Sequence, residues 1–531
     1  MKKKLVLLFL FFYTSLYAKN PSFQEIEVMP SSYAKDYYTW RFIQEKSTTK
    51  KEAIKAYQWT KRKSSKLRKV IRKKVGYIPH SGKKSKKKRD PNNYIIYPST
   101  ASKKSLKSLK KLYKKIKKQK KYSEVLHIMS SDKPFETLVM FPAQTQAYVF
   151  NRVGTKYRKK HFNKAFSKEN LRKLIQTKQF NESIYKIVTT HKLQKLKKSL
   201  LLVPDNNLTF QSNFLLAINA IEFNEKKKAL NFLKIAETKT TFQSHYDQIN
   251  FWNYLISEKK EYLEKLKNSN QVNIYTLRAR DILKLPYPEV VTPNLEYKKL
   301  TNIDITNPID WEKIKLEMKK HPEKLHELAE KYKSHETEGV YTYIKEKASK
   351  YKIPYYPIPY REAMWGFSKK RRATLYALAR QESRFVPASV SPSYALGMLQ
   401  IMPFLIEHLA KERKKTLDLN EMFNPYVAIS YANQHMNYLN RYLYHPLFVA
   451  YAYNGGIGFT RRTIRSKHLF KHGKYEPYLS MELIDSIEAR DYGKKVLANY
   501  VIYANLLGIQ TKVSPLLDKL EHPSQTDRFR K

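Results

Sequence analysis

The sequence predicts an almost wholly α-helical protein, in which a solenoid-like series of helices precedes a second α-helical domain. From about residue 123 to 352, apolar residues recur at spacings of three and four, and the alternation typical of β-strands is absent. The stretch IPYYPIPY at 353–360 then interrupts this pattern, since three prolines in six residues oppose regular structure. We therefore expect a basic α-superhelical region at 19–352, a linker at 353–360 and a second domain at 361–512, followed by a disordered polar tail at 513–531.

The solenoid prediction depends on several apolar stripes separated by short polar turns. Helical hairpins of this kind stack because each one alone leaves an apolar face exposed, although no fixed repeat length emerges here. The clearest stripes are Phe214, Leu215, Ile218, Ile221 and Phe223; Ala229, Phe232, Leu233 and Ala236; Phe251, Trp252, Leu255 and Ile256; and Tyr262, Leu263 and Leu266.

Two basic stretches precede these helices. Residues 82–93, GKKSKKKRDPNN, indicate an exposed loop. Residues 103–122 predict a helix with an apolar stripe under a dense lysine face. That helix fits either an amphipathic segment on an anionic surface or a solenoid helix with a solvated outer face, and we favour the second interpretation.

Length, charge and cysteine content limit the class of protein. With 531 residues the chain should form two to four domains, and its net charge of +57 favours anionic partners. Residues 1–18 have the basic start, the short apolar core and the small final residue of a secretion signal, so we expect a cleavable signal peptide, export to the periplasm and no transmembrane segment in the mature chain. Export makes nucleic acid an unexpected partner. The chain has no cysteine, which excludes disulfides and thiol nucleophiles.

One acidic side chain lies where a helix should be apolar. Leu375, Leu378 and Ala379 share a helical face, and the next position on that face is Glu382. Burial disfavours a carboxylate, so the pKa of Glu382 should rise towards ~6, where the group can donate a proton near neutral pH. Because Pro387 follows closely, the helix should end near this residue. Glu382 is thus a general acid candidate, or else a buried acid neutralised by Arg380 or Arg384.

The residues that follow resemble the catalytic domain of the soluble lytic murein transglycosylases. That family has a Glu-Ser pair ending a helix, a G-L-M-Q-I-M-P loop, an A-Y-N-A-G turn and an E-T-R-x-Y helix start. Here these marks read ES at 382–383, GMLQIMP at 397–403, AYNGG at 452–456 and EARDY at 488–492. The resemblance implies a lysozyme-like fold that cleaves the bond between N-acetylmuramic acid and N-acetylglucosamine in peptidoglycan. It implies glycan strands as partners, and it is compatible with an association with cell-wall machinery.

The resemblance also implies roles for individual residues. Glu382 would be the catalytic acid, and substrate would contact six others: Ser383, Gln400, Met402, Tyr453, Asn454 and Glu488. The residues themselves leave other roles open, because Gln400 can stabilise a turn, Asn454 can cap a helix, and Glu488 can face inwards as a structural residue.

The chemistry expected of a lone acid differs from that of ordinary glycosidases, which use two carboxylates. Glu407, Asp418 and Glu421 lie in later polar stretches and are not spaced as partners of Glu382. A single acid requires the substrate to supply the second group, and the mechanism that the family resemblance implies is one in which the substrate does so and forms a 1,6-anhydro sugar without water. A water-using muramidase of the same fold and a noncatalytic glycan-binding scaffold are the alternatives.

Two departures from the family pattern affect the loop, and one pair of histidines needs an interpretation. A glycine of the family is Tyr394 here, which places a ring where the loop turns, and Met398-Leu399 exchanges the usual order of two residues of similar volume. His468 and His472 are spaced like a metal pair but have no third ligand, so we predict neither a metal nor any other cofactor.

Overall fold

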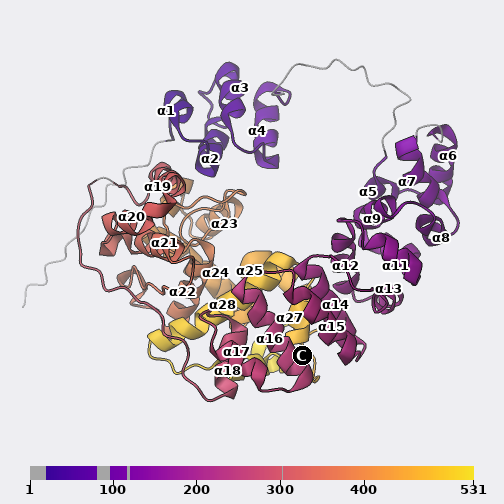
Figure 1. The fold of residues 1–531 in the computed structure, drawn as a ribbon. Helices are drawn as coiled ribbons and strands as arrows, with labels where there is room; N and C mark the ends of the chain where they lie inside the picture. The colour runs from indigo at the N-terminus through magenta and orange to yellow at the C-terminus, as the bar shows by residue number, and fades with distance from the viewer. Residues whose placement is uncertain (1–19, 80–95, 117–119, 302, 531) are drawn as a thin grey trace, which may run out of the picture. The chain divides into compact units, whose positions relative to one another are not determined.

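The computed structural model describes residues 20–79, 96–116, 120–301 and 303–530, and within them the chain is built from helices and turns (Figure 1). No strand occurs among these residues, only four isolated β-bridges. The all-α prediction is therefore confirmed. The predicted signal peptide at 1–18 and the basic loop at 82–93 lie outside the described residues. Within the described part, no helix is long and apolar enough to cross a membrane.

The described residues divide into two compact units. The first unit contains residues 20–79 and 290–437, and the second contains 96–289 and 438–530. The division falls within one helix, α24 (Pro425–Asn440), rather than at the proline-rich stretch. The sequence-derived domain boundaries therefore stay predictions, and residues 353–360 lie inside the first unit.

The first unit combines four N-terminal helices with the helices on either side of the proline-rich stretch (Figure 1). Its α-helices are α1 (Phe23–Val28), α2 (Tyr33–Phe42), α3 (Lys50–Trp59), α4 (Ser65–Val75), α19 (Pro308–Lys320), α20 (Leu325–Lys331), α21 (Glu338–Ala348), α22 (Lys369–Glu382), α23 (Pro403–Glu412) and α24 (Pro425–Asn440). Short 3₁₀ turns are η2 (Pro322–Lys324), η3 (His335–Thr337), η4 (Glu362–Met364) and η5 (Leu419–Phe423).

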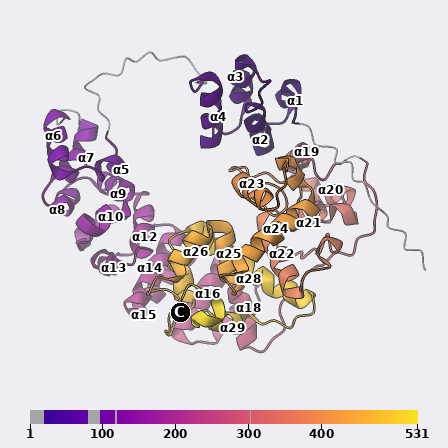
Figure 2. The same cartoon turned by 180° about the vertical axis from the view of Figure 1, so that it is seen from behind.

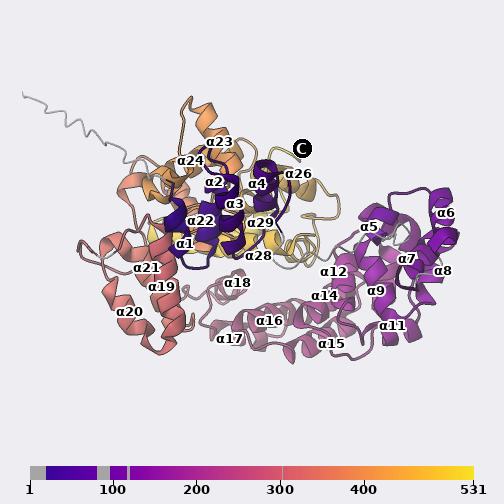
Figure 3. The same cartoon turned by 90° about the horizontal axis from the view of Figure 1, so that it is seen from above.

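The second unit begins with a succession of short helices, most of which contact a neighbour in the chain (Figure 3). They are α5 (Pro98–Ala101), α6 (Leu106–Ile116), α7 (Lys120–Ser130), α8 (Pro134–Val139), α9 (Ala143–Arg152), α10 (Thr155–Tyr157), the π-turn η1 (Arg158–Phe162), α11 (Lys168–Leu174), α12 (Phe180–Val188), α13 (Gln194–Leu200), α14 (Phe210–Glu222), α15 (Lys226–Glu237), α16 (Gln243–Ser257), α17 (Glu261–Lys267) and α18 (Ile274–Ile282).

The same unit ends with helices from the C-terminal part of the chain (Figure 2). They are α25 (Pro446–Gly455), α26 (Ile457–Ile464), α27 (Tyr478–Glu482), α28 (Ile487–Leu506), α29 (Val513–Lys519) and α30 (Pro523–Thr526). The helices α25 and α28 lie in close contact because Gly493 has no side chain: a Cβ there would stand 2.1 Å from the ring of Tyr451.

The apolar stripes of the solenoid region form its core. Helices α14 and α15 are in contact, and their residues Phe214, Ile218, Phe232 and Leu233 are buried. Helix α6 packs on α7, and the ring of Tyr113 stacks on His127 at 5.1 Å between centroids. The apolar face of α6 is thus used inside the protein, which favours a solenoid helix over a surface-binding one.

The polar tail does not have the predicted disorder. Residues 513–530 form α29 and α30, and Val513, Leu517 and Leu520 are fully buried. Asp281 of α18 accepts hydrogen bonds from Ser514, from its amide at 2.9 Å and from its hydroxyl at 2.6 Å. The expectation of a disordered tail is therefore wrong: its three apolar side chains pack as one turn-spaced stripe.

A buried ion pair connects the solenoid helices with the C-terminal helices of the second unit. Lys494 of α28 contacts the carboxylate of Glu482 at 2.9 Å, and both side chains are almost inaccessible. Tyr275 of α18 donates its hydroxyl to the same carboxylate at 2.5 Å, and Gln248 of α16 donates to it at 3.0 Å. One carboxylate thus holds three helices, and its charge is satisfied only while Lys494 remains in place.

Replacing Lys494 by Met should lower the free energy of unfolding by about 3–5 kcal/mol, since it leaves the carboxylate of Glu482 buried without a counter-charge. Urea denaturation followed by circular dichroism measures this change. Lys173→Met is the matched control, because Lys173 pairs with Glu169 on an exposed face, and it should have a much smaller effect. Equal losses in the two variants would show that Glu482 is not stabilised by its lysine.

Candidate active site

Glu382 is the last residue of α22, as the sequence predicts. Its helical stripe is buried, with Leu375, Leu378 and Ala379 inaccessible, whereas Glu382 itself is half-buried. The stripe therefore leads out of the core and ends at a carboxyl group that solvent can reach. The predicted elevation of its pKa stays a prediction.

The chain turns sharply straight after this helix. Arg384 and Phe385 have φ angles of +55° and +66°, which are unfavourable for residues with side chains. Two such residues in succession persist only where their surroundings fix them. Phe385 is fully buried, and a Cβ at Gly339 of α21 would stand 2.3 Å from its carbonyl oxygen. The close approach of α21 therefore fixes the turn that follows Glu382.

A buried carboxylate on α21 holds the chain on both sides of Glu382. Glu346 contacts Arg380 at 2.6 Å, and it also pairs with Arg384. The guanidinium of Arg380 lies 4.1 Å from the ring centroid of Tyr356, a residue of the proline-rich stretch. Both arginines that we considered as partners of Glu382 therefore bind Glu346, a residue that sequence reasoning did not single out.

The loop from Ser389 to Pro403 is tied to the end of α22. Ser383 is buried and donates its hydroxyl to the carbonyl oxygen of Met398 at 2.7 Å. Gly397 has a φ of +76°, and a Cβ on it would stand 2.0 Å from the carbonyl oxygen of Met422, so only glycine fits. The loop carrying the GMLQIMP motif is thus held by backbone contacts on two sides.

Gln400 braces this loop. Its amide nitrogen donates to the carbonyl oxygens of Ser389 at 3.0 Å and Gly397 at 2.8 Å. These contacts are those of a turn-stabilising residue, and they leave its carbonyl oxygen, Oε1, as the atom that can accept a bond from a ligand. Met402, which is half-buried, is the residue before α23.

Tyr394 joins the same loop to the N-terminal helices of the first unit. Its φ is +63° and its side chain is buried. The ring lies 5.7 Å from Trp40 and 6.2 Å from Tyr37, and the hydroxyl is 3.2 Å from that of Ser64. The loop accepts a strained tyrosine because aromatic contacts with α2 offset the unfavourable backbone conformation.

Two further contacts fasten α2 near this loop. Arg41 forms two hydrogen bonds with the carboxylate of Asp418, at 2.8 and 2.5 Å. The hydroxyl of Tyr37 donates to the side chain of Asn420 at 2.9 Å. The side chain of Asp418 is therefore paired with Arg41. The backbone amide of Asp418 donates to the carboxylate of Glu421 at 2.9 Å.

Tyr394→Gly should lower the free energy of unfolding by about 3 kcal/mol, since it removes a buried ring and only partly recovers backbone strain. Tyr394→Phe keeps the ring and should cost about 1 kcal/mol for the lost hydroxyl contact. Chemical denaturation of the two variants beside the parent protein checks the order. A glycine variant as stable as the parent would mean that the ring contributes nothing.

The proline-rich stretch lies along α22. Arg380 donates to the carbonyl oxygen of Tyr355 at 3.0 Å, and Tyr376 donates to that of Pro359 at 3.1 Å. Glu338 of α21 accepts the backbone amide of Ile358 at 2.9 Å. Burial raises the pKa of the Glu338 carboxyl to about 7, against the lowering effects of that amide and of Arg361.

This raised pKa makes the protonated form of Glu338 the favoured one in the folded state. Stability from this group is therefore complete at acidic pH and falls as the pH rises from its unfolded pKa, about 4.3, to about 7. Glu338→Gln should remove this loss, so the variant gains up to about 3 kcal/mol over the parent between pH 5 and pH 8.

Urea unfolding at several pH values measures that difference. Glu327→Gln, on an exposed face of α20, is the control, and its difference from the parent should stay constant. A constant difference for Glu338→Gln as well would contradict the assignment.

The remaining predicted residues lie in the second unit. Tyr453 and Asn454 are half-buried near the end of α25, which terminates at Gly455 and is followed by Gly456 with a φ of +82°. Asn454 donates to Glu488 at 3.3 Å. Glu488 is exposed in the first turn of α28, which does not favour the inward-facing structural role that the sequence left open, whereas Tyr492 and Val496, at helical spacing from it, are buried.

The structure thus brings the predicted residues into two groups. Glu382, Ser383, Gln400 and Met402 belong to the first unit, and Tyr453, Asn454 and Glu488 to the second. His468 and His472, the spaced histidines, have separate neighbours: His468 stacks on His191, and His472 contacts Glu521 at 2.9 Å.

Comparison with known proteins relates part of this site to a known family of domains. Residues 362–475 match the family model of the transglycosylase SLT domain. This part of the chain, from the turn before α22 to the loop after α26, is thus similar to a transglycosylase SLT domain. The resemblance read from the four motifs is thus confirmed at the level of the family.

The curated relatives that the chain matches are soluble lytic murein transglycosylases. The protein of that name from Salmonella typhimurium is 26% identical over 159 residues, which cover 29% of this chain and 24% of the relative. The Escherichia coli K12 protein is 29% identical over 135 residues, covering 25% and 20%. The chain matches about a quarter of the length of these curated relatives.

Solved structures of similar proteins extend over more of the chain at lower identity. The 70-kDa soluble lytic transglycosylase of Escherichia coli is 16% identical with a TM-score of 0.47, covering 93% of this chain and 84% of that one. An inactive mutant of the lytic transglycosylase Slt from Pseudomonas aeruginosa is 14% identical with a TM-score of 0.46, covering 92% and 78%. At these scores, no residue role is transferred from them.

Proposed function

We propose that this chain is a lytic transglycosylase that cleaves the β-1,4 bond between N-acetylmuramic acid and N-acetylglucosamine in peptidoglycan and leaves 1,6-anhydro ends. The observation that carries the proposal is the position of Glu382, a half-buried carboxyl group at the end of α22 inside the segment that matches a transglycosylase SLT domain. The names of the curated relatives, which are murein transglycosylases, support the substrate.

The reaction uses one protein carboxyl group twice. Glu382 first donates its proton to the glycosidic oxygen, and the bond from that oxygen to the anomeric carbon of the muramic acid residue breaks. The 2-acetamido oxygen of the same sugar stabilises the anomeric carbon by bonding to it. The carboxylate of Glu382 then accepts the proton of the 6-hydroxyl, whose oxygen bonds to the anomeric carbon as the acetamido oxygen leaves. No water is consumed.

The rigidity of the chain around Glu382 supports this role. A group that acts first as acid and then as base must stay within hydrogen-bonding distance of two different substrate oxygens. Glu346 and Gly339 fix the turn after Glu382, and Ser383 connects that turn to the 389–403 loop. In this proposal the Oε1 atom of Gln400 accepts a hydrogen bond from a sugar hydroxyl, and Met402 lines the glycan groove.

The family resemblance also implies roles for three residues of the second unit. Tyr453 would orient the acetamido group through its hydroxyl. Asn454 and Glu488, which are hydrogen-bonded to each other, would hold the turn that carries Tyr453. We further propose that the protein is exported by its signal peptide, acts in the periplasm in turnover of the cell wall, and can associate with cell-wall machinery.

Incubating the mature protein with purified sacculi should release muropeptides lighter by one water than the reducing forms, because the 6-hydroxyl replaces water as nucleophile. Glu382→Gln should reduce this release at least 1,000-fold, about 4 kcal/mol of transition-state stabilisation, since an amide cannot donate the proton. Mass spectrometry of the soluble products measures both effects.

The same experiment separates the alternatives. Reducing-end products would identify a water-using muramidase of this fold. An absence of products from the parent protein, together with sacculus binding that Glu382→Gln retains, would identify a noncatalytic scaffold. Glu327→Gln, an exposed change of the same kind, should leave product release unchanged and excludes a general effect of losing one carboxylate.

A further inference from the structure

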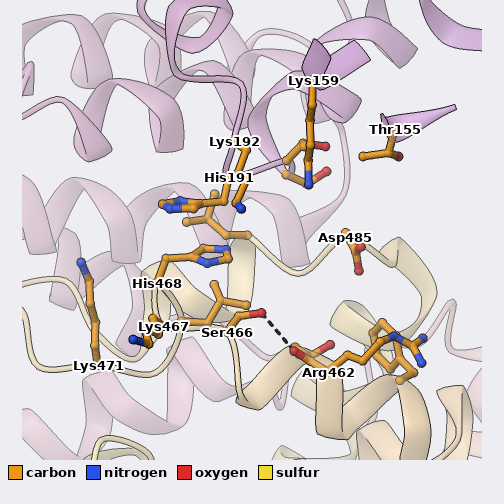
Figure 4. A pocket seen from close by; sticks show the side chains of 16 residues that line it. Thr155, Lys159, His191, Lys192, Arg462, Ser466, Lys467, His468, Lys471 and Asp485 are labelled. Carbon is orange, nitrogen blue, oxygen red and sulfur yellow. Dashed lines mark hydrogen bonds between the residues drawn. The ribbon is translucent and has the colours of Figure 1, made fainter. Parts of the chain in front are cut away.

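The second unit contains a cavity of about 810 Å³ that is separate from the residues assigned to the active site (Figure 4). One wall comes from the turns around α10 and after α12, and the other from α26 and the loop that follows it. Its volume is in the usual range of sites that bind small organic molecules or short peptides. We call it the cationic pocket and define it by Lys159, Lys192, Arg462, Lys467 and Lys471.

Positive charge dominates this pocket, whose lining has five basic side chains and, among the described residues, one acid, Asp485. Within the described part of the chain, none of its five basic side chains forms an ion pair, although surface lysines elsewhere do so, as Lys173 does with Glu169. All five are exposed. Five like charges around one cavity repel one another and raise the local concentration of anions. An anionic ligand would relieve that repulsion.

Two stacked histidines form part of the wall (Figure 4). The rings of His191 and His468 are 4.0 Å apart between centroids and inclined by 11°. Burial, together with His191 and nearby lysines, Lys471 among them, lowers the pKa of His468 to about 4. The pKa of His191 is also lowered, by burial first and then by nearby lysines. The pair is therefore neutral at pH 7 and provides a flat surface for a ligand.

The pocket also offers acceptors for hydrogen bonds. Ser466 donates its hydroxyl to the carbonyl oxygen of Arg462 at 3.0 Å, and Thr189 donates to that of Tyr185 at 2.8 Å. With their hydrogens used in this way, the two hydroxyl oxygens can only accept further bonds. Asp485, the one acid among the described lining residues, is a third acceptor. A ligand matched to this lining has N–H donors as well as anionic groups.

We propose that the cationic pocket binds an acidic peptide, with its carboxylates on the basic side chains and an N–H or ammonium group on Asp485. A peptide fits better than an oligophosphate, which has no N–H donor and would be repelled by Asp485. The source of the peptide rests on the proposed function, because the stems of peptidoglycan are peptides that carry carboxylates. The pocket would then hold a stem while the glycan is cleaved elsewhere.

Isothermal titration of the intact mature protein with N-acetylated Ala-Glu-Lys-Ala tests this proposal, since the probe has two carboxylates and one ammonium group but no sugar. The double variant Lys467→Gln/Lys471→Gln should bind it about tenfold more weakly than the parent protein. The matched control is Lys227→Gln/Lys234→Gln, which removes the same charge from exposed positions of α15 and should change the affinity less than twofold.

A second measurement tests whether the bound peptide lies in the cationic pocket. Diethyl pyrocarbonate modifies neutral imidazoles, so bound peptide should protect His191 and His468 in the parent protein, as mapped by mass spectrometry. The fully amidated peptide should produce no heat of binding and should not protect the two histidines from modification. The proposal is overturned if the amidated peptide binds equally well, if both double variants weaken binding alike, or if tripolyphosphate binds in the pocket and the peptide does not.

Failure here and failure of the proposed function give different results. If the parent protein does not bind the peptide, it can still release anhydro-muropeptides from sacculi, and only the pocket proposal fails. If the parent protein binds the peptide but releases no anhydro-muropeptides, the pocket proposal stands and the proposed enzymatic function fails.

Discussion

The geometry around Glu382, the candidate acid, depends on the ion pairs that the carboxylate of Glu346 forms. This carboxylate is buried, and it binds one arginine inside α22 and another just beyond its end. A buried carboxylate that lacks such partners is expensive, so the fold is committed to keeping all three groups together. The two residues after Ser383 adopt unfavourable backbone angles only because α21 closes against them. The orientation of Glu382 is thus set by a helix that begins 44 residues earlier in the chain.

The local part of this arrangement could be predicted from the sequence. The stripe of Leu375, Leu378 and Ala379 determines where Glu382 lies on its helix, and Pro387 limits how far that helix can continue, because these features depend on residues a few positions apart. The pairing of Glu346 with Arg384 could not be predicted, since it joins distant segments and nothing local distinguishes Glu346 from other glutamates of the region.

The error about the tail and the exposed position of Glu488 have physical causes as well. The tail contains many polar residues, which suggested disorder, yet Val513, Leu517 and Leu520 recur at helical spacing and pack together. Glu488 shares a stripe with Tyr492 and Val496, but it lies in the first turn of α28, where a helix favours an exposed acid near its free amide groups. Periodicity alone does not say where a buried stripe stops. Tyr394 shows a related limit, because the aromatic residues that accommodate it come from α2.

The contacts of the proline-rich stretch bear on how this domain can be inherited or exchanged. Residues 353–360 are fastened to α22 through Arg380, Tyr376 and Tyr356, so they act as part of the wall of the domain rather than as a spacer. A domain that begins at residue 361 would lack the ring of Tyr356 on which the guanidinium of Arg380 lies. Arg380 would also lose its hydrogen bond to the backbone carbonyl of Tyr355. A domain of this kind is not a cassette that recombination can move at its apparent sequence boundary. Functional hybrids with other transglycosylases would need their junction upstream of α21.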